Sequence, residues 1–159
     1  MKPRAVAVPL PNRHLPNADW ADRFELALDG KGMTAAEAAE LSLGRSPRWV
    51  RNLLRLRNGA VSIIGLKTAA PGPGRLGLVG AFPVLERSDD EVVLGLDDKH
   101  LDFRIVVDVR AGSAVNQIVG VTTLIRRHNA LGRVYLAAVM PFHKMIVPTL
   151  LANVGRPGC

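Results

Sequence analysis

The sequence predicts an α+β domain in which an antiparallel sheet packs against one long C-terminal helix. Between residues 78 and 127, apolar segments alternate with short turn-forming segments, a pattern typical of an antiparallel meander. From residue 131 to residue 150, apolar side chains recur every three or four positions, which is the spacing of one helix face. Strands that come first and a long helix that follows them indicate the α+β class.

The composition places the chain among single folded domains. It has 159 residues, of which 48% are hydrophobic, and a chain of this size buries about two-thirds of the surface that it exposes when unfolded. We predict a Pro-rich, extended N-terminal arm over residues 1–17 and one α+β domain over residues 18–155. Aromatic residues make up 4% of the chain, so the core must consist mainly of Val, Leu, Ile and Ala side chains.

One strand and two helices are predicted before the meander. The segment ADWADRFELAL predicts a strand at residues 23–28. Thr34, with Glu37 three residues later, has the capping-box pattern of a helix start, and Gly44 ends that helix. A serine and a proline then begin a second helix, which we expect over residues 47–64.

The meander contributes four further strands, which together with the first make five. In the strand at 101–109, five apolar residues alternate with positions that hold Asp102, Arg104 and Asp108 on the other face. Alternation of this length is typical of a half-buried strand. Short turns that contain Asp, Ser or Gly join the strands. The four strands cover residues 78–87, 91–96, 101–109 and 115–127.

The last helix gives the strongest periodic signal in the chain. Asn129 is a suitable N-cap, and the helix is predicted to end near Gly155. Pro141 and Pro148 are expected to kink or interrupt it. We predict that one face of this helix is buried against Leu101, Phe103, Ile105 and Val107. That face consists of Leu131, Val134, Tyr135, Ala138, Val139, Phe142 and Ile146.

No residue pattern in the sequence indicates catalysis, a metal site or a cofactor. The segment PGPGRLGLVG contains prolines and is not followed by a predicted helix, which favours a linker over a phosphate-binding loop. The sequence has no CxxC or HExxH motif, and its four histidines lack the spacing of a zinc ligand set. The Asp clusters at 89–90 and 97–98 fall in hairpin turns, where Asp is favoured by turn geometry. We therefore expect a protein that is not an enzyme.

We also expect a cytoplasmic protein without a transmembrane segment. The first residues contain no apolar run of the length that a signal peptide needs. Cys159 is the one cysteine, so an internal disulfide cannot form, which favours a reducing compartment. The most hydrophobic stretch, residues 134–151, carries His143 and Lys144 near its middle, where a spanning helix rarely holds such residues.

The helix predicted at 47–64 is both basic and amphipathic. The chain has a net charge of +7, and residues 41–85 contain no acidic side chain. This helix lacks the companion elements of a specific nucleic-acid reader, whereas packing against the core accounts for its apolar side. We predict that the apolar side is buried and that the arginines face solvent, with weak, salt-sensitive association with polyanions or membrane surfaces. The predicted basic surface is Arg48, Arg51 and Arg55, and the apolar side is Trp49, Val50, Leu53 and Leu54.

Three segments of the chain resemble a bacterial family called domain of unknown function 2867. They are GRSPRWVRNLLRLRNGAVSIIGLK, FPVLERSDDEVVLGLDDKHLDFRIVV and TTLIRRHNALGRVYLAAVMPFHKMIVPTLL, and the resemblance extends over residues 18–154. The order of the predicted elements is also similar to the helix-grip fold of START and Bet v 1-like proteins, with two helices inserted after the first strand. That resemblance implies a curved sheet of seven strands around the final helix, with an apolar cavity between them.

The leading functional hypothesis is a non-enzymatic module that binds a small apolar or amphipathic ligand between the sheet and the C-terminal helix. Such pockets are mostly apolar and contain a few placed polar groups. The alternatives are a protein-interaction or membrane-surface module that uses the basic helix 47–64, and an unrecognised enzyme. No cofactor is expected. The residues predicted to line the ligand cavity are Phe103, Arg104, His128, Tyr135, Phe142 and His143.

Overall fold

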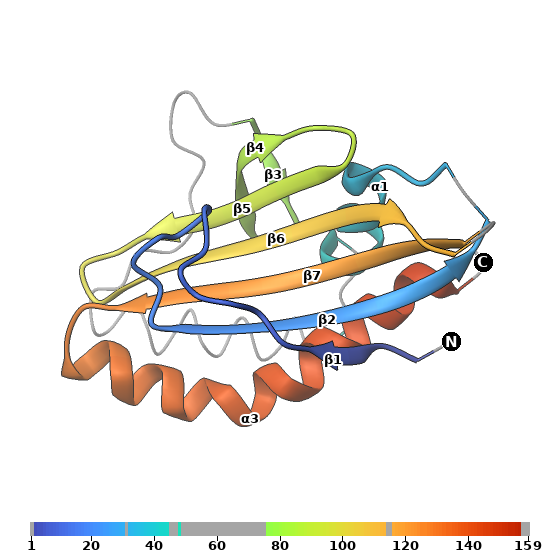
Figure 1. Ribbon diagram of the computed structural model, residues 1–159. Coiled ribbons are helices and arrows are strands. Elements are labelled where there is room, and N and C mark those ends of the chain that lie inside the picture. The colour runs from blue at the N-terminus through green and yellow to red at the C-terminus, as the bar shows by residue number, and fades with distance from the viewer. Residues whose placement is uncertain (1, 31, 45–47, 49–75, 114–115, 157–159) are drawn as a thin grey trace.

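The computed structural model describes residues 2–30, 32–44, 48, 76–113 and 116–156 (Figure 1). Its described part is one antiparallel sheet with helices on one face. The helical elements are α1 (Ala35–Ala39), the π-helical turn η1 (Glu40–Gly44), α3 (Ala130–Ala152) and the 3-10 turn η2 (Asn153–Gly155). The strands are β1 (Arg4–Val6), β2 (Trp20–Asp29), β3 (Leu78–Val79), β4 (Phe82–Arg87), β5 (Glu91–Asp97), β6 (Leu101–Ala111) and β7 (Asn116–Arg127).

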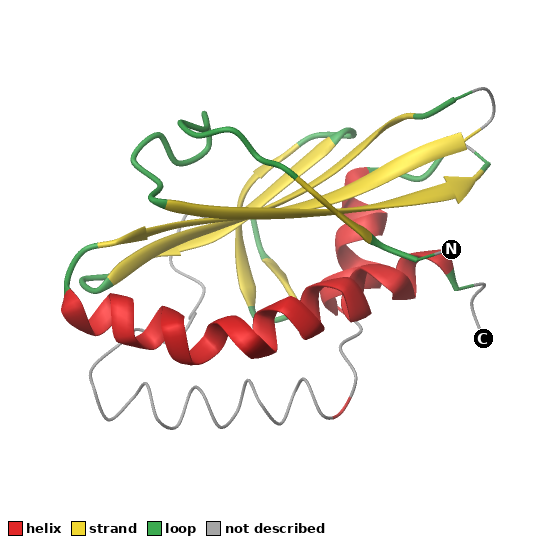
Figure 2. Ribbon diagram, turned by 60° about the horizontal axis from the view of Figure 1, so that its bottom comes forward, coloured by secondary structure: helices red, strands yellow, loops and turns green. Residues whose placement is uncertain are grey.

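The sheet has the order β1-β2-β7-β6-β5-β4-β3, and every neighbouring pair is antiparallel. Figure 2 shows α3 lying across one face of this sheet. At the C-terminal end of α3, Leu150 and Leu151 join Leu26, Val107 and Val119 in the main core. The predicted α+β class, with a long C-terminal helix packed on an antiparallel sheet, is therefore confirmed.

The described residues form seven strands rather than the predicted five. The first additional strand is β1 in the N-terminal arm, which pairs with β2 so that Arg4 lies opposite Glu25. The second arises because the predicted strand 78–87 is divided into β3 and β4. Gly80 turns the chain there with a φ of +58°, and it packs so closely on the carbonyl of Leu43 that a side chain would not fit.

The first inserted helix begins as the capping box predicts. The Thr34 hydroxyl accepts a hydrogen bond from the Glu37 amide at 3.3 Å, and the Glu37 carboxylate accepts one from the Thr34 amide at 2.8 Å. Helix α1 then continues into η1, which ends at Gly44 as expected. The second inserted helix, predicted at 47–64, lies outside the described residues except for Arg48.

The face of α3 that contacts the sheet is only in part the predicted one. Leu136 and Gly132 are buried, whereas Val134 is 67% exposed and Phe142 is 45% exposed. Ala138 is exposed as well, while Tyr135, Val139 and Ile146 are partly buried towards the sheet.

The rotation of α3 is explained by close packing at its first turn. A side chain at Gly132 would collide with the carbonyl of His100, so the glycine lets the helix lie against the β5–β6 turn. Leu136 lies one turn further along on the same side of the helix, where it is buried with Leu101 and Ile125. The helix continues without interruption through Pro141 and Pro148.

Among the described residues, α3 with η2 is the one helix that is long and apolar enough to cross a membrane by length and composition alone. Its inner side packs on the sheet through Leu136, Leu150 and Leu151, which are all buried. Contact with the core therefore accounts for the apolar residues of that side without a membrane.

The opposite face of the sheet carries a partly buried network of charges centred on Arg23. Arg23 donates two hydrogen bonds to Asp108, at 2.6 and 2.8 Å, one to Glu25 at 2.9 Å and one to Thr122 at 2.7 Å. Burial alone would raise the pKa of Glu25, but hydrogen bonds from Arg110 and Arg23 outweigh burial and hold this pKa below its usual value. The hydrogen bond to Asp108 raises the pKa of Arg23, so this guanidinium stays charged.

Candidate functional site

A cavity of about 170 Å³ lies between the sheet and α3. Strands β4, β6 and β7 form one wall, and the inner side of α3 forms the other. The lining is mostly aliphatic and aromatic, and a few polar side chains lie among these groups. The central apolar contributors are Phe82, Phe103, Ile105, Val121, Val139 and Ile146.

Strand alternation explains why these side chains share one wall. In the pairing of β6 with β7, Phe103 lies opposite Ile125 and Ile105 lies opposite Thr123. Directly paired residues project to the same face of an antiparallel sheet. Every second residue of both strands therefore points at α3, and the predicted inward face of the strand at 101–109 is confirmed for Phe103 and Ile105.

Aromatic side chains are concentrated at this cavity although they are scarce in the chain. Two of the four phenylalanines, Phe82 and Phe103, line it together with the one tyrosine, Tyr135. The rings of Phe82 and Phe103 meet edge to face, with centroids 6.0 Å apart and an interplanar angle of 80°. This is a favoured geometry for aromatic pairs, and it offers ring edges and faces to a third ring.

Thr123 places a hydroxyl in this apolar wall. Its side chain is 6% exposed, and its Oγ1 atom is buried without a hydrogen-bond partner. The preceding residue, Thr122, is 5% exposed on the opposite face, where its Oγ1 accepts a hydrogen bond from Arg23. Two adjacent threonines of nearly equal burial therefore lie on opposite faces of the sheet, and the one that lines the cavity has a hydroxyl without a partner.

His143 is the second polar residue of the lining, and it is tied to the sheet. Its Nε2 atom lies 2.9 and 3.1 Å from the two carboxylate oxygens of Asp22 on β2. Its ring also meets that of Trp20 edge to face, at a centroid distance of 5.5 Å. Asp22 is paired directly with Thr123 across β2 and β7, so the Asp22–His143 pair flanks the unpartnered hydroxyl.

The structure brings together three of the six residues predicted for the cavity. Phe103, Tyr135 and His143 line it. Arg104 projects from the other face of β6, where it donates hydrogen bonds to Asp97 at 2.6 Å and to the Phe103 carbonyl at 2.9 Å. His128, after the end of β7, pairs with Asp102 at 2.9 Å.

Phe142 lies on the outer side of α3 and is not among the described residues that line the cavity. Of the predicted basic surface, Arg48 is exposed, and Arg51 and Arg55 fall outside the described residues. Within the described ranges, no group of three or more His, Cys, Asp or Glu side chains is arranged to hold a metal ion.

Thr123 was not identified from the sequence, although a signal for it exists. In the segment VNQIVGVTTLIRR, the positions 119, 121 and 125 are apolar and share one face, and Thr123 interrupts that face with a hydroxyl. A polar residue at an apolar-face position of a central strand marks either a satisfied core hydroxyl or a ligand contact. The missing hydrogen-bond partner is visible only in the structure.

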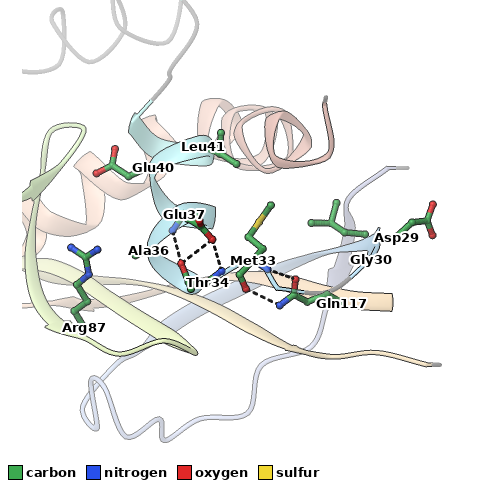
Figure 3. A pocket seen from close by; sticks show the side chains of 11 residues that line it. Asp29, Gly30, Met33, Thr34, Ala36, Glu37, Glu40, Leu41, Arg87 and Gln117 are labelled. Atoms are coloured by element: carbon green, nitrogen blue, oxygen red, sulfur yellow. Dashed lines mark hydrogen bonds between the residues drawn. The ribbon is translucent and has the colours of Figure 1, made fainter. Parts of the chain in front are cut away.

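A second, wider hollow of about 840 Å³ lies beside α1, at the end of the sheet formed by the C-terminal ends of β2 and β4 and the start of β7 (Figure 3). Polar groups here hold the chain in place. Gln117 accepts a hydrogen bond from the Met33 amide at 3.2 Å and donates one to the Met33 carbonyl at 2.8 Å, next to the capping box of Thr34 and Glu37. Because the polar groups of Gln117, Thr34 and Glu37 are satisfied within the protein, we consider the cavity beneath α3, with its unpartnered hydroxyl, the stronger candidate site.

The family comparison agrees with the resemblance seen in the sequence. A family model described as "Protein of unknown function (DUF2867)" matches residues 14–150. This match covers most of the chain, and the chain belongs to that family. No curated protein matches the chain.

Proposed function

We propose that this member of the DUF2867 family is a non-enzymatic module that binds a small apolar or amphipathic molecule between the sheet and α3. The observation that carries the proposal is the 170 Å³ cavity with an unpartnered hydroxyl in its apolar wall. An engineered apolar cavity of about 150 Å³ in another protein is large enough to bind benzene. The volume therefore suits a molecule of one ring.

The architecture supports the same proposal by analogy. We propose that the domain has the helix-grip fold of START and Bet v 1-like proteins, and its seven antiparallel strands and long C-terminal helix support this assignment. In that fold the space between sheet and helix is the place where a ligand cavity is expected. Because a fold does not fix a function, the side chains of the cavity carry more weight than the fold does.

The proposal predicts that the protein retains a small molecule when it is purified from cells. Native mass spectrometry of the full chain is expected to show a noncovalent adduct, which denaturation releases. Val139→Phe fills the cavity from α3 and should abolish the adduct. Val134→Phe makes the same change on the exposed side of the same helix, so this control should retain it.

Two results would contradict the proposal. One is an adduct that Val139→Phe retains as fully as the unchanged protein does, because the molecule would then be bound elsewhere. The other is a protein that releases no small molecule and whose amide NMR spectrum stays unchanged when single-ring compounds are added.

A further inference from the structure

The polar groups of the cavity also indicate the chemical class of its ligand. We infer that the cavity selects a neutral, single-ring aromatic molecule whose hydroxyl or carbonyl group forms a hydrogen bond with Thr123. This inference rests on the proposed function and adds to it the charge, the shape and the polar anchor of the ligand. Three features of the described lining support it.

The anchor follows from the state of Thr123. Its Oγ1 is buried with no partner, and a buried polar group without a hydrogen bond is costly. A ligand that bonds this hydroxyl removes the cost, whereas a purely apolar ligand leaves it in place. Because a threonine hydroxyl both donates and accepts, it fits an alcohol or phenol as well as a carbonyl.

The neutral charge follows from the pairing of the charged groups. None of the described residues that line the cavity is a lysine or arginine that would balance an anionic ligand. Asp22 is paired with Thr123 across β2 and β7, and both of its carboxylate oxygens already lie within hydrogen-bond distance of Nε2 of His143. Among the described lining residues, a charged ligand would therefore find no free counter-ion, and burying an unpaired charge is strongly unfavourable.

The aromatic shape follows from the walls. Phe82, Phe103 and Tyr135 supply rings to a cavity in a chain with few aromatic residues. The edge-to-face pair of Phe82 and Phe103 leaves ring surface that a flat ring contacts favourably. The volume of about 170 Å³ fits one such ring with a small substituent.

Phenol and toluene provide a matched pair of probes, since they differ only in a hydroxyl and a methyl group. Their dissociation constants are measured by amide NMR titration of the full chain and of Thr123→Val. The valine keeps the shape of the side chain and removes the hydroxyl. Thr123→Ser keeps the hydroxyl and serves as the rescuing variant, and the NMR spectra show whether each variant is folded.

We expect phenol to bind the unchanged protein with shifts at Thr123 and Phe103. In Thr123→Val the ratio of the phenol to the toluene dissociation constant should rise by about 2- to 12-fold. This change corresponds to the loss of the net free energy of one hydrogen bond between phenol and the protein. Thr123→Ser should keep the original ratio. Benzoate, which is anionic at pH 7, should bind at least about 10-fold more weakly than phenol because its charge has no partner.

The outcomes separate this inference from the proposed function. If both probes bind but their ratio is the same in Thr123→Val, the anchor is wrong and the proposed function stands. If benzoate binds as tightly as phenol, the neutral class is wrong. If neither phenol nor toluene perturbs the residues of the cavity, the inference fails together with the proposed function.

Discussion

Replacing Thr123 by valine should stabilise the ligand-free protein, which is an unusual expectation for a core substitution. An unpartnered buried hydroxyl costs about 1–3 kcal/mol, and valine has nearly the same shape without that polar atom. Thr123 is 6% exposed, and its Oγ1 has no partner. We therefore expect the free energy of unfolding to rise by about 1–2 kcal/mol. This expectation lies in the lower part of the range of about 1–3 kcal/mol because the groups around residue 123 can adjust to the hydroxyl.

Thr122→Val is the matched control, since it makes the same chemical change one residue earlier in the same strand. The Thr122 hydroxyl accepts a hydrogen bond from Arg23 at 2.7 Å, and hydrogen bonds to charged groups contribute about 1.5–3 kcal/mol. Arg23 keeps its bonds to Asp108 and Glu25, so the expected loss is about 1.5 kcal/mol. The two variants should thus change stability in opposite directions.

Urea unfolding followed by circular dichroism measures both changes, after any bound molecule has been removed by refolding from denaturant. Each kcal/mol also moves Tm by about 2–4 °C in a domain of this size. If Thr123→Val lowers the stability as much as Thr122→Val does, the hydroxyl at 123 has a partner in solution. That result would refute the expectation that the Thr123 hydroxyl is unpartnered.

Three further changes test the packing and the charges. Gly120→Ala should destabilise the protein by about 1–3 kcal/mol in urea unfolding, because the new methyl group collides with the Arg23 guanidinium. An unchanged urea midpoint would show that residue 120 and the Arg23 guanidinium are not in such close contact. Leu136→Ala should cost about 2–5 kcal/mol and Val134→Ala less than about 0.5 kcal/mol, and similar losses would mean that the rotation of α3 is wrong. The pKa of Glu25 is lower in the folded protein than its unfolded value near 4.5, so the ionised carboxylate stabilises the fold at pH values above 4.5, and this stabilisation is lost as the pH falls through the folded pKa. Glu25→Gln should therefore reduce the acid dependence of the free energy of unfolding, measured at about pH 6 and below. An unchanged pH profile would contradict this expectation.

The sheet could be predicted from the sequence because its signals are local. Alternation in the strand at 101–109 identified the inward side of β6, and the pair Thr34 and Glu37 identified the start of α1. The strand β1 was missed because a strand of three residues in a Pro-rich arm has no periodicity of its own. It exists only through its pairing with β2, which is a tertiary contact.

The contact face of α3 could not be predicted because the helix is apolar on several sides. Spacings of three and four residues fit a face that contains Val134 and Phe142 as well as they fit the face that contains Leu136 and Leu151. The choice between them is made at Gly132, whose missing side chain lets the first turn approach His100. Periodicity finds a helix, but a single close contact fixes its rotation.

The same limit applies to the candidate site. The sequence directed attention to Tyr135 and His143, which are conspicuous polar groups on an apolar helix, and both line the cavity. It also indicated Arg104, although the alternation of β6 itself assigns residue 104 to the face opposite Phe103. That two-residue period excludes Arg104 and places Thr123 on the inner face of β7, between the apolar residues 121 and 125.

Thr122 and Thr123 show why the period of the strand decides what a residue can do. They are identical in type, adjacent in sequence and almost equally buried, yet one meets Arg23 and the other meets an apolar cavity. Neither composition nor propensity distinguishes them, since both properties are the same at the two positions. Only the arrangement of α3 on one face and of the charged network on the other makes the first hydroxyl a structural contact and the second a candidate ligand contact.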